Sequence, residues 1–123
     1  MHTVRIPWAR WYGDEKHPIW FPDDWEVIMA EMEGAASIDK GAMEKALDDP
    51  IDSPPLQELA RGRKSVGIIV DDISRPTPGH LLLPPIIRRL EEGGVKREDI
   101  SIFLSLGAHR PMTRDDMIKK LGH

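Results

Sequence analysis

The chain has 123 residues, which is the length of one domain, so a string of independent modules is not expected. Hydrophobic residues make up 40% and charged residues 31% of the sequence, as in an ordinary soluble globular protein. No stretch approaches the ~18 consecutive apolar residues of a membrane span, and the N-terminal residues lack the apolar core of a signal peptide. We therefore expect a cytoplasmic protein that does not bind membranes.

Charge and metal-ligating residues exclude further classes of function. Lys and Arg number 17 against 21 Asp and Glu, and they are scattered among the acidic residues, so the basic patch of a nucleic-acid binder is missing. The absence of Cys excludes disulfides and thiolate chemistry. No two of the 5 His residues have the i, i+3 or i, i+4 spacing that lets a helix present two ligands to one metal. No metal site is expected in this chain.

Residues 1–36 are predicted to form a β-hairpin region. The segments Val4–Tyr12 and Ile19–Phe21 have the composition of short strands, and Gly13–Lys16 between them predicts a turn. The 4 tryptophans of the sequence all lie in this region: Trp8, Trp11, Trp20 and Trp25. A platform that stacks a ligand is one interpretation, but we favour a hairpin that buries its large aromatic side chains.

Residues 37–63 are predicted to form two short helices that cover the rest of the domain. The first spans Ile38–Leu47, and the Asp-Asp-Pro sequence after it ends it because proline disfavours helical geometry in the residue before it. Ser53 is the expected N-cap of the second helix, with Pro54 at its first position and Gly62 just past its end.

Residues 64–123 are predicted to form a βαβα unit. The run Val66–Val70 is too short for a helix and does not alternate, which is typical of a strand buried on both faces of a parallel sheet. A helix follows over Gly79–Leu90, and Pro84–Pro85 either start its regular part or kink it. Ile100–Leu106 is the second predicted strand.

A final helix is predicted to begin after Thr113, its expected N-cap, with Asp116 in place for a capping box. The order of elements predicts an α/β fold: a Rossmann-like βαβ unit with parallel strands, preceded by an N-terminal β-hairpin and short helices. Two parallel strands cannot form a two-faced sheet with a core of its own. We therefore expect residues 1–123 to be an incomplete domain, the N-terminal part of a larger α/β domain.

Polar residues follow both predicted strands. Because parallel strands end at the same edge of a sheet, Asp72, Arg75 and His109 are expected to share one rim, where open α/β sheets bind ligands. Arg75 either binds a carboxylate or phosphate with paired hydrogen bonds or forms an internal pair with Asp72. His109 suits general acid–base catalysis, since the ordinary pKa of histidine is ~6.5, but a lone His after a strand is more often a structural hydrogen-bonding residue.

Three further residues near this rim carry weaker signals. Asp71 either contacts a ligand or braces the loop after the strand, and Arg110 either binds phosphate or faces solvent. Free N–H groups near Thr113 could meet an anion. The glycines form neither GxGxxG nor a P-loop, so these motifs give no support for phosphate binding.

Two segments, Val70–Pro78 (VDDISRPTP) and Leu106–Thr113 (LGAHRPMT), resemble the N-terminal domain of nickel-dependent lactate racemase and its relatives. The similarity extends more loosely through Tyr12-Gly13, through Asp49-Pro50-Ile51 and through the helix between the two segments. The resemblance therefore touches most of the chain, and its two main motifs together are fairly specific.

The resemblance implies a racemase or epimerase of 2-hydroxy acids. The family uses a nickel pincer nucleotide, nickel pyridinium-3,5-bisthiocarboxylic acid mononucleotide, whose pyridinium takes a hydride from C2 of the substrate and returns it to either face. On the matching positions, His109 is one of two acid–base histidines, Arg75 binds the substrate carboxylate and Asp72 is its polar neighbour. The cofactor contacts expected from this chain are Asp71, Arg110 and Thr113.

Two positions depart from the usual pattern of the family. Ser74 stands where Thr is common, and Ala108 interrupts what is usually a Gly-Thr-His-Arg run. The cofactor-tethering lysine, the nickel-binding histidine and the second catalytic histidine of the family lie beyond residue 123. We therefore expect this chain alone to be inactive, to bind no cofactor and to act with the remainder of the enzyme, and its exposed sheet edge could let it self-associate.

Two hypotheses from other classes of function stay open beside the racemase. One is a non-catalytic α/β module that binds a small carboxylate or phosphate and acts through a partner chain. The other is a structural interaction domain whose exposed sheet edge is the contact surface. In the second case, substitutions at the rim residues would be tolerated.

Overall fold

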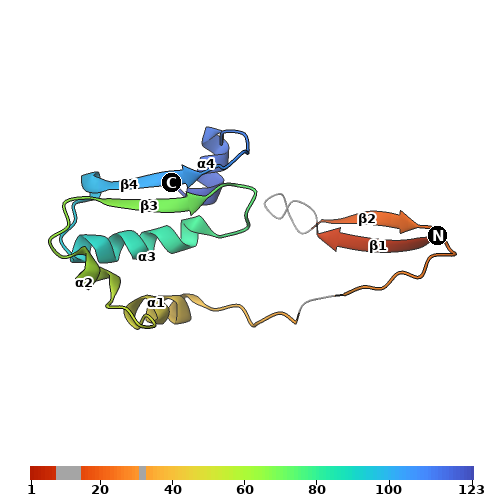
Figure 1. Cartoon of the computed structure of the whole chain (residues 1–123), viewed down its shortest axis with the longest axis horizontal. Coiled ribbons are helices and arrows are strands. Elements are labelled where there is room, and N and C mark those ends of the chain that lie inside the picture. The colour runs from red at the N-terminus through yellow and green to blue at the C-terminus, as the bar shows by residue number, and fades with distance from the viewer. Residues whose placement is uncertain (8–14, 31–32) are drawn as a thin grey trace. The chain divides into compact units, whose positions relative to one another are not determined.

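The computed structural model describes residues 1–7, 15–30 and 33–123, and the chain divides into two compact units, Met1–Ser37 and Ile38–His123. In the first unit, β1 (His2–Pro7) and β2 (Lys16–Phe21) pair in antiparallel fashion (Figure 1). The predicted hairpin is confirmed. The remainder of its predicted first strand, residues 8–12, lies outside the described residues.

The aromatic side chains of this hairpin unit are more exposed than the sequence suggested. Trp20 is 59% exposed and Trp25 is 57% exposed, so the interpretation that the hairpin buries them is wrong. The physical reason is that a two-stranded sheet on its own has no second layer to cover its faces. Trp8 and Trp11 lie outside the described residues.

The second unit begins with α1 (Lys40–Asp48), whose bounds are close to those of the predicted helix, Ile38–Leu47. Asp39 caps it, because the Asp39 carboxylate accepts a hydrogen bond of 2.7 Å from the Ala42 N–H. A carboxylate at this end also faces the positive end of the helix dipole.

The next helix, α2 (Leu56–Ala60), starts later than predicted. Ser53 does not cap it, because the Ser53 hydroxyl donates to the carbonyl of Pro54 and Pro55 is the residue before the first helical position. Because proline disfavours helical geometry in the residue before it, Ser53 and Pro54 stay outside the helix, and Pro55, with ψ of 150°, is its N-cap. Gly62, with φ of 72°, lies just past the helix end as predicted.

The rest of the second unit is a βαβ motif followed by a helix. Strands β3 (Val66–Asp71) and β4 (Ile100–Ser105) are parallel and hydrogen-bonded to each other, and α3 (Gly79–Glu92) connects them (Figure 1). A short 3₁₀ turn at Arg97–Asp99 leads into β4. The predicted Rossmann-like α/β arrangement is confirmed, and α4 (Arg114–Leu121) is the final helix.

Helix α3 contains the two adjacent prolines. It begins at Gly79, so Pro84 and Pro85 lie inside it and do not start it. The helical hydrogen bonds that residues 84 and 85 would donate are missing, because proline has no N–H. Leu83, Pro85 and Leu90 are nevertheless buried, so packing holds this helix against the sheet.

The core lies between α2, α3 and one face of the sheet, and its buried residues are Ala60, Leu90 and Val95. On the opposite face, Ile69 is 77% exposed and Phe103 is 59% exposed. The prediction that this strand is buried on both faces is therefore wrong for this chain. A helix packs on only one face of the two strands within the described ranges. No described helix has both the length and the apolar character that crossing a membrane requires.

An ion-pair network joins α1 to α3. Arg89 is 2% exposed, and its guanidinium lies 2.7 Å from the Glu44 carboxylate and 2.6 Å from the Asp48 carboxylate. Burial acts to lower the pKa of Arg89, but the hydrogen bonds with Asp48 and Glu44 outweigh it and raise the pKa. A buried cation needs such partners, since an isolated buried charge is very costly.

Gly93, at the end of α3, permits the close packing of α2. A Cβ at this position would lie 2.5 Å from the Ala60 Cβ and 2.5 Å from the Gln57 carbonyl oxygen. We expect Gly93→Ala to lower the free energy of unfolding by about 1–3 kcal/mol, the usual cost of overpacking, as measured by urea denaturation. Gly34→Ala is the matched control, because a Cβ there meets nothing within 4 Å. Equal stabilities of the two variants would contradict this account of the packing.

Candidate active site

The carboxyl ends of β3 and β4 bring two loops together. In the parallel register, Asp71 at the end of β3 stands opposite Ser105 at the end of β4. After β4 the chain turns sharply, with Gly107 at φ of 56° and the His109 N–H donating to the Leu106 carbonyl at 3.0 Å. Glycine adopts this left-handed conformation without steric cost. The turn places His109 beside the loop that follows β3.

A hydrogen bond between Asp72 and His109 is the central contact of this rim. The Asp72 Oδ2 atom lies 2.6 Å from His109 Nδ1. The Asp72 side chain is 5% exposed, whereas that of His109 is 55% exposed. Because Asp72 occupies Nδ1, proton exchange with a ligand falls to Nε2 of the same ring. This is the arrangement by which a buried carboxylate orients an acid–base histidine.

Ser74 fixes the other oxygen of the Asp72 carboxylate. Its hydroxyl donates to Asp72 Oδ1 at 2.5 Å, and its backbone N–H donates to the same atom at 3.1 Å. The Ser74 hydroxyl bond is the main cause that lowers the pKa of Asp72; burial opposes it, and the bond with His109 lowers the pKa further. Asp72 is thus held as a carboxylate. The spacing of Asp72 and Ser74 is that of a local side-chain turn and could have been found in the sequence.

Arg75 lies in the same loop and exposes its side chain. Within the described parts of the chain, no carboxylate forms an ion pair with its guanidinium, so the internal Arg75–Asp72 pair considered from the sequence is not formed. Its backbone is nevertheless well held, because the Arg75 N–H donates to the Asp72 carbonyl at 3.2 Å. The Arg75 carbonyl accepts a hydrogen bond of 2.8 Å from Lys120 Nζ.

Asp71 braces this loop. Its carboxylate lies 2.5 Å from Lys120 Nζ and accepts a 2.6 Å hydrogen bond from the Thr77 hydroxyl. Burial acts to raise the pKa of Asp71, but the hydrogen bonds from Lys120 and Thr77 outweigh it and the pKa is lowered. The sequence gives no signal for this role of Lys120, since a lysine in the last turn of a terminal helix normally faces solvent.

Arg110 and Thr113 both meet Asp116 at the start of α4. Thr113 and Asp116 form the capping box predicted from the sequence, with distances of 2.9 and 3.2 Å between side-chain oxygens and backbone nitrogens. Arg110 Nη1 donates to the Asp116 carboxylate at 2.8 Å. The hydrogen bond from Arg110 is the first of the causes that lower the pKa of Asp116 to about 2.

The rim residues thus separate into two groups. Asp72 and His109 are in direct contact and Arg75 lies in the same loop as Asp72, whereas Arg110 and Thr113 form contacts with Asp116 at the N-terminal cap of α4. Among the residues that the structure describes, no group of three or more His, Asp or Glu side chains is arranged to hold a metal ion.

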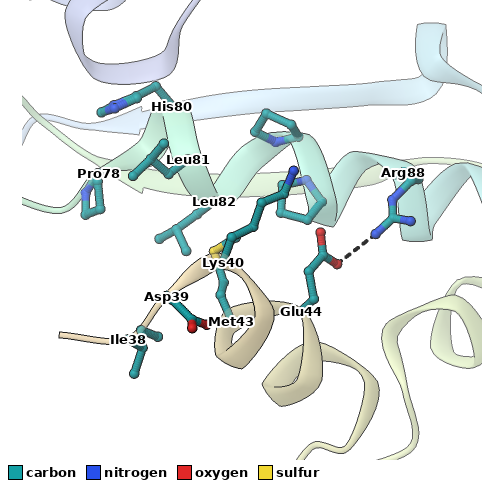
Figure 2. A pocket seen from close by; sticks show the side chains of 12 residues that line it. Ile38, Asp39, Lys40, Met43, Glu44, Pro78, His80, Leu81, Leu82 and Arg88 are labelled. Carbon is teal, nitrogen blue, oxygen red and sulfur yellow. Dashed lines mark hydrogen bonds and ion pairs between the residues drawn. The ribbon is translucent and has the colours of Figure 1, made fainter. Parts of the chain in front are cut away.

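A separate groove of about 710 Å³ lies between α1 and the first half of α3. Figure 2 shows Met43 and Leu82 near its centre and the Arg88–Glu44 ion pair, of 2.7 Å, at one end. His80 also lines the groove, but none of the described rim residues does. The groove is therefore a feature distinct from the Asp72–His109 rim.

The fold and the rim define a Rossmann-like α/β chain that presents a carboxylate-oriented histidine and an arginine at the ends of parallel strands. Residues 12–123 match the family model described as the lactate racemase N-terminal domain, and the chain belongs to this family.

Individual relatives agree with this assignment. The chain is 41% identical over 80 residues to the lactate racemase of Lactiplantibacillus plantarum, an alignment that covers 65% of this chain and 19% of the relative. It is 29% identical to the lactate racemase of Thermoanaerobacterium thermosaccharolyticum, covering 99% of this chain and 28% of the relative. The apoprotein structure of the lactate racemase from this second organism superposes with a TM-score of 0.60 and covers 99% of this chain and 27% of its own. The chain thus spans less than a third of the length of these relatives.

Asp116 gives the rim region a measurable pH dependence. Its pKa is about 2 in the folded protein, against 3.8 for the free side chain. Because the folded value is the lower one, ionised Asp116 stabilises the fold above pH ~4, and this contribution is lost as the pH falls from ~4 to ~2. Urea denaturation should show this loss in the wild type and a smaller one in Asp116→Asn, with Asp115→Asn as the control that retains it. A carboxyl titration of Asp116 by NMR with a midpoint at the ordinary value would contradict this account.

Proposed function

We propose that this chain supplies the substrate side of a racemase site for 2-hydroxy acids of the lactate type. The observation that carries the proposal is the 2.6 Å bond between Asp72 and His109 beside the exposed Arg75. The names of the relatives, all lactate racemases, support the same reaction class.

His109 is proposed as the acid–base residue. In the interconversion of lactate isomers, the hydroxyl group must lose a proton when C2 is oxidised and regain it when C2 is reduced. His109 Nε2 takes and returns this proton, while Asp72 holds Nδ1 and stabilises the protonated ring. One base, His109, can exchange the hydroxyl proton on one face of the substrate. Proton exchange on the opposite face needs a second residue from outside this chain.

Arg75 is proposed to bind the substrate carboxylate. Its guanidinium has a fixed fork of N–H donors that matches the two oxygens of a carboxylate. Because no described carboxylate competes for it, a substrate can pair with Arg75 without breaking an existing ion pair. The carboxylate bond then orients C2 and its hydroxyl group toward the histidine.

Few side chains among the described residues are available to hold the nickel pincer nucleotide of the family. The Asp71 carboxylate is engaged by Lys120 and Thr77, and the Thr113 hydroxyl by the Asp116 N–H. When bound in the complete enzyme, the cofactor supplies the hydride acceptor for C2. We therefore assign the holding of nickel and nucleotide to the remainder of the enzyme, which is the expected partner of this chain, and leave the proposed contacts of Asp71, Arg110 and Thr113 as secondary.

The proposal is tested with a chimera in which this chain replaces the corresponding part of the lactate racemase from Thermoanaerobacterium thermosaccharolyticum, loaded with its nickel cofactor. Chiral chromatography should detect conversion of L-lactate to D-lactate. A folded and loaded chimera that binds lactate without converting it would overturn the racemase proposal and favour a carboxylate-binding module.

Substitutions in this chimera separate the two proposed roles. His109→Gln should lower kcat by about 10²–10⁴, the usual contribution of a general acid–base residue. The matched control is His80→Gln, since His80 lines the separate groove and lies outside the rim. Equal turnover of His109→Gln and wild type would contradict the catalytic assignment.

Arg75→Ala should raise KM for lactate by about 10- to 150-fold, which corresponds to one lost charged hydrogen bond of ~1.5–3 kcal/mol. Arg75→Lys should recover only part of the loss, because lysine keeps the charge but not the paired geometry. Arg61→Ala, at an exposed position after α2, is the control. An unchanged KM in Arg75→Ala would remove Arg75 from the site.

A further inference from the structure

Lys120 is the most deeply buried charged side chain among the described residues. Its relative exposure is 0%, although it lies in the last turn of α4. Its Nζ atom contacts the Asp71 carboxylate at 2.5 Å and the Arg75 carbonyl at 2.8 Å. Asp71 is the last residue of β3 and Arg75 lies in the loop that follows it, so one ammonium group ties the end of α4 to the rim.

The packing around Lys120 is built to allow this contact. A Cβ on Gly79, the first residue of α3, would lie 2.6 Å from the Lys120 carbonyl oxygen. Only glycine lets the two helices approach this closely. The burial of an ammonium group is costly unless it is paired and hydrogen-bonded. Its placement against a carboxylate and a backbone carbonyl therefore compensates the burial at the same time as it fixes the loop.

The consequence is greatest for Arg75. Its N–H is bound to the Asp72 carbonyl and its C=O to Lys120, so its backbone is held on both sides. Its side chain, in contrast, is exposed and has no ion-pair partner within the described ranges. Carboxylate recognition is favoured by a fixed backbone and a guanidinium that is available to the ligand, because less conformational freedom is lost when the ligand binds.

We infer that Lys120 is a positioning residue that holds Arg75 in place for the substrate carboxylate, through its paired contacts with Asp71 and with the Arg75 backbone. This inference rests on the proposed function, since it takes the carboxylate-binding role of Arg75 as given. Lys120 itself does not contact substrate in this arrangement.

The test measures lactate kinetics of Lys120→Met in the cofactor-loaded chimera described above. Methionine keeps much of the apolar stem and removes the ammonium group. KM should rise, by up to about 100-fold for a displacement on the order of 1 Å, while kcat at saturating lactate changes much less. A KM within twofold of wild type would overturn the inference.

A double variant separates positioning from stability. In Lys120→Met alone, the Asp71 carboxylate loses its ammonium partner, so the loop can also be destabilised. Asp71→Asn/Lys120→Met removes both charges and should regain stability, yet KM should stay raised because the hydrogen bond to the Arg75 carbonyl is still missing. Recovery of a wild-type KM in the double variant would show that only charge balance mattered and would overturn the inference.

Arg89→Met is the matched control for the loss of a buried cation. Arg89 is as deeply buried as Lys120 within a few per cent, but it pairs with Glu44 and Asp48 and not with the rim. It should lower the free energy of unfolding without raising KM. If the unsubstituted chimera is folded, loaded with cofactor and binds lactate without converting it, the proposed function fails; if it is active and Arg75→Ala raises KM but Lys120→Met does not, only the role of Lys120 fails.

Discussion

The hydrogen bond between Asp72 and His109 is the contact on which the site depends. It joins the loops after β3 and β4, and it can form only because these strands are parallel and end in register. Helix α3 makes this pairing possible, since parallel neighbours need a long crossover. The fold thus serves the site through one geometric result: two chain segments, far apart in sequence, present their polar side chains at the same edge.

The two adjacent carboxylates at this edge of the sheet have different partners. Asp71 is the last residue of β3 and Asp72 is the first residue after it, and their side chains reach different partners. Asp72 meets His109 and Ser74, while Asp71 meets Lys120 and Thr77. The first set of contacts orients the histidine that we propose for proton transfer, and the second braces the loop after β3. The pKa of both carboxylates is lowered, so both are ionised at neutral pH.

Local signals explain which features the sequence could predict. The parallel strands, the capping box of Thr113 and the gathering of rim residues after the strands all follow from short-range patterns and from the topology of a βαβ unit. Two features depended on tertiary context: the burial of Lys120 and the exposure of Ile69. The local sequence pattern of a lysine near a helix end, or of a run of β-branched residues, is the same whether or not another layer of structure covers it.

The orientation of His109 can be measured most directly by ¹⁵N NMR of the imidazole ring in the 123-residue chain. With the ring neutral, the account predicts that Nδ1 carries the proton and donates it to Asp72, while Nε2 has the chemical shift of an unprotonated nitrogen. In Asp72→Asn this preference should be lost. A neutral ring that is protonated at Nε2 in the wild type would contradict the central claim, because the nitrogen available to substrate could then not accept its proton.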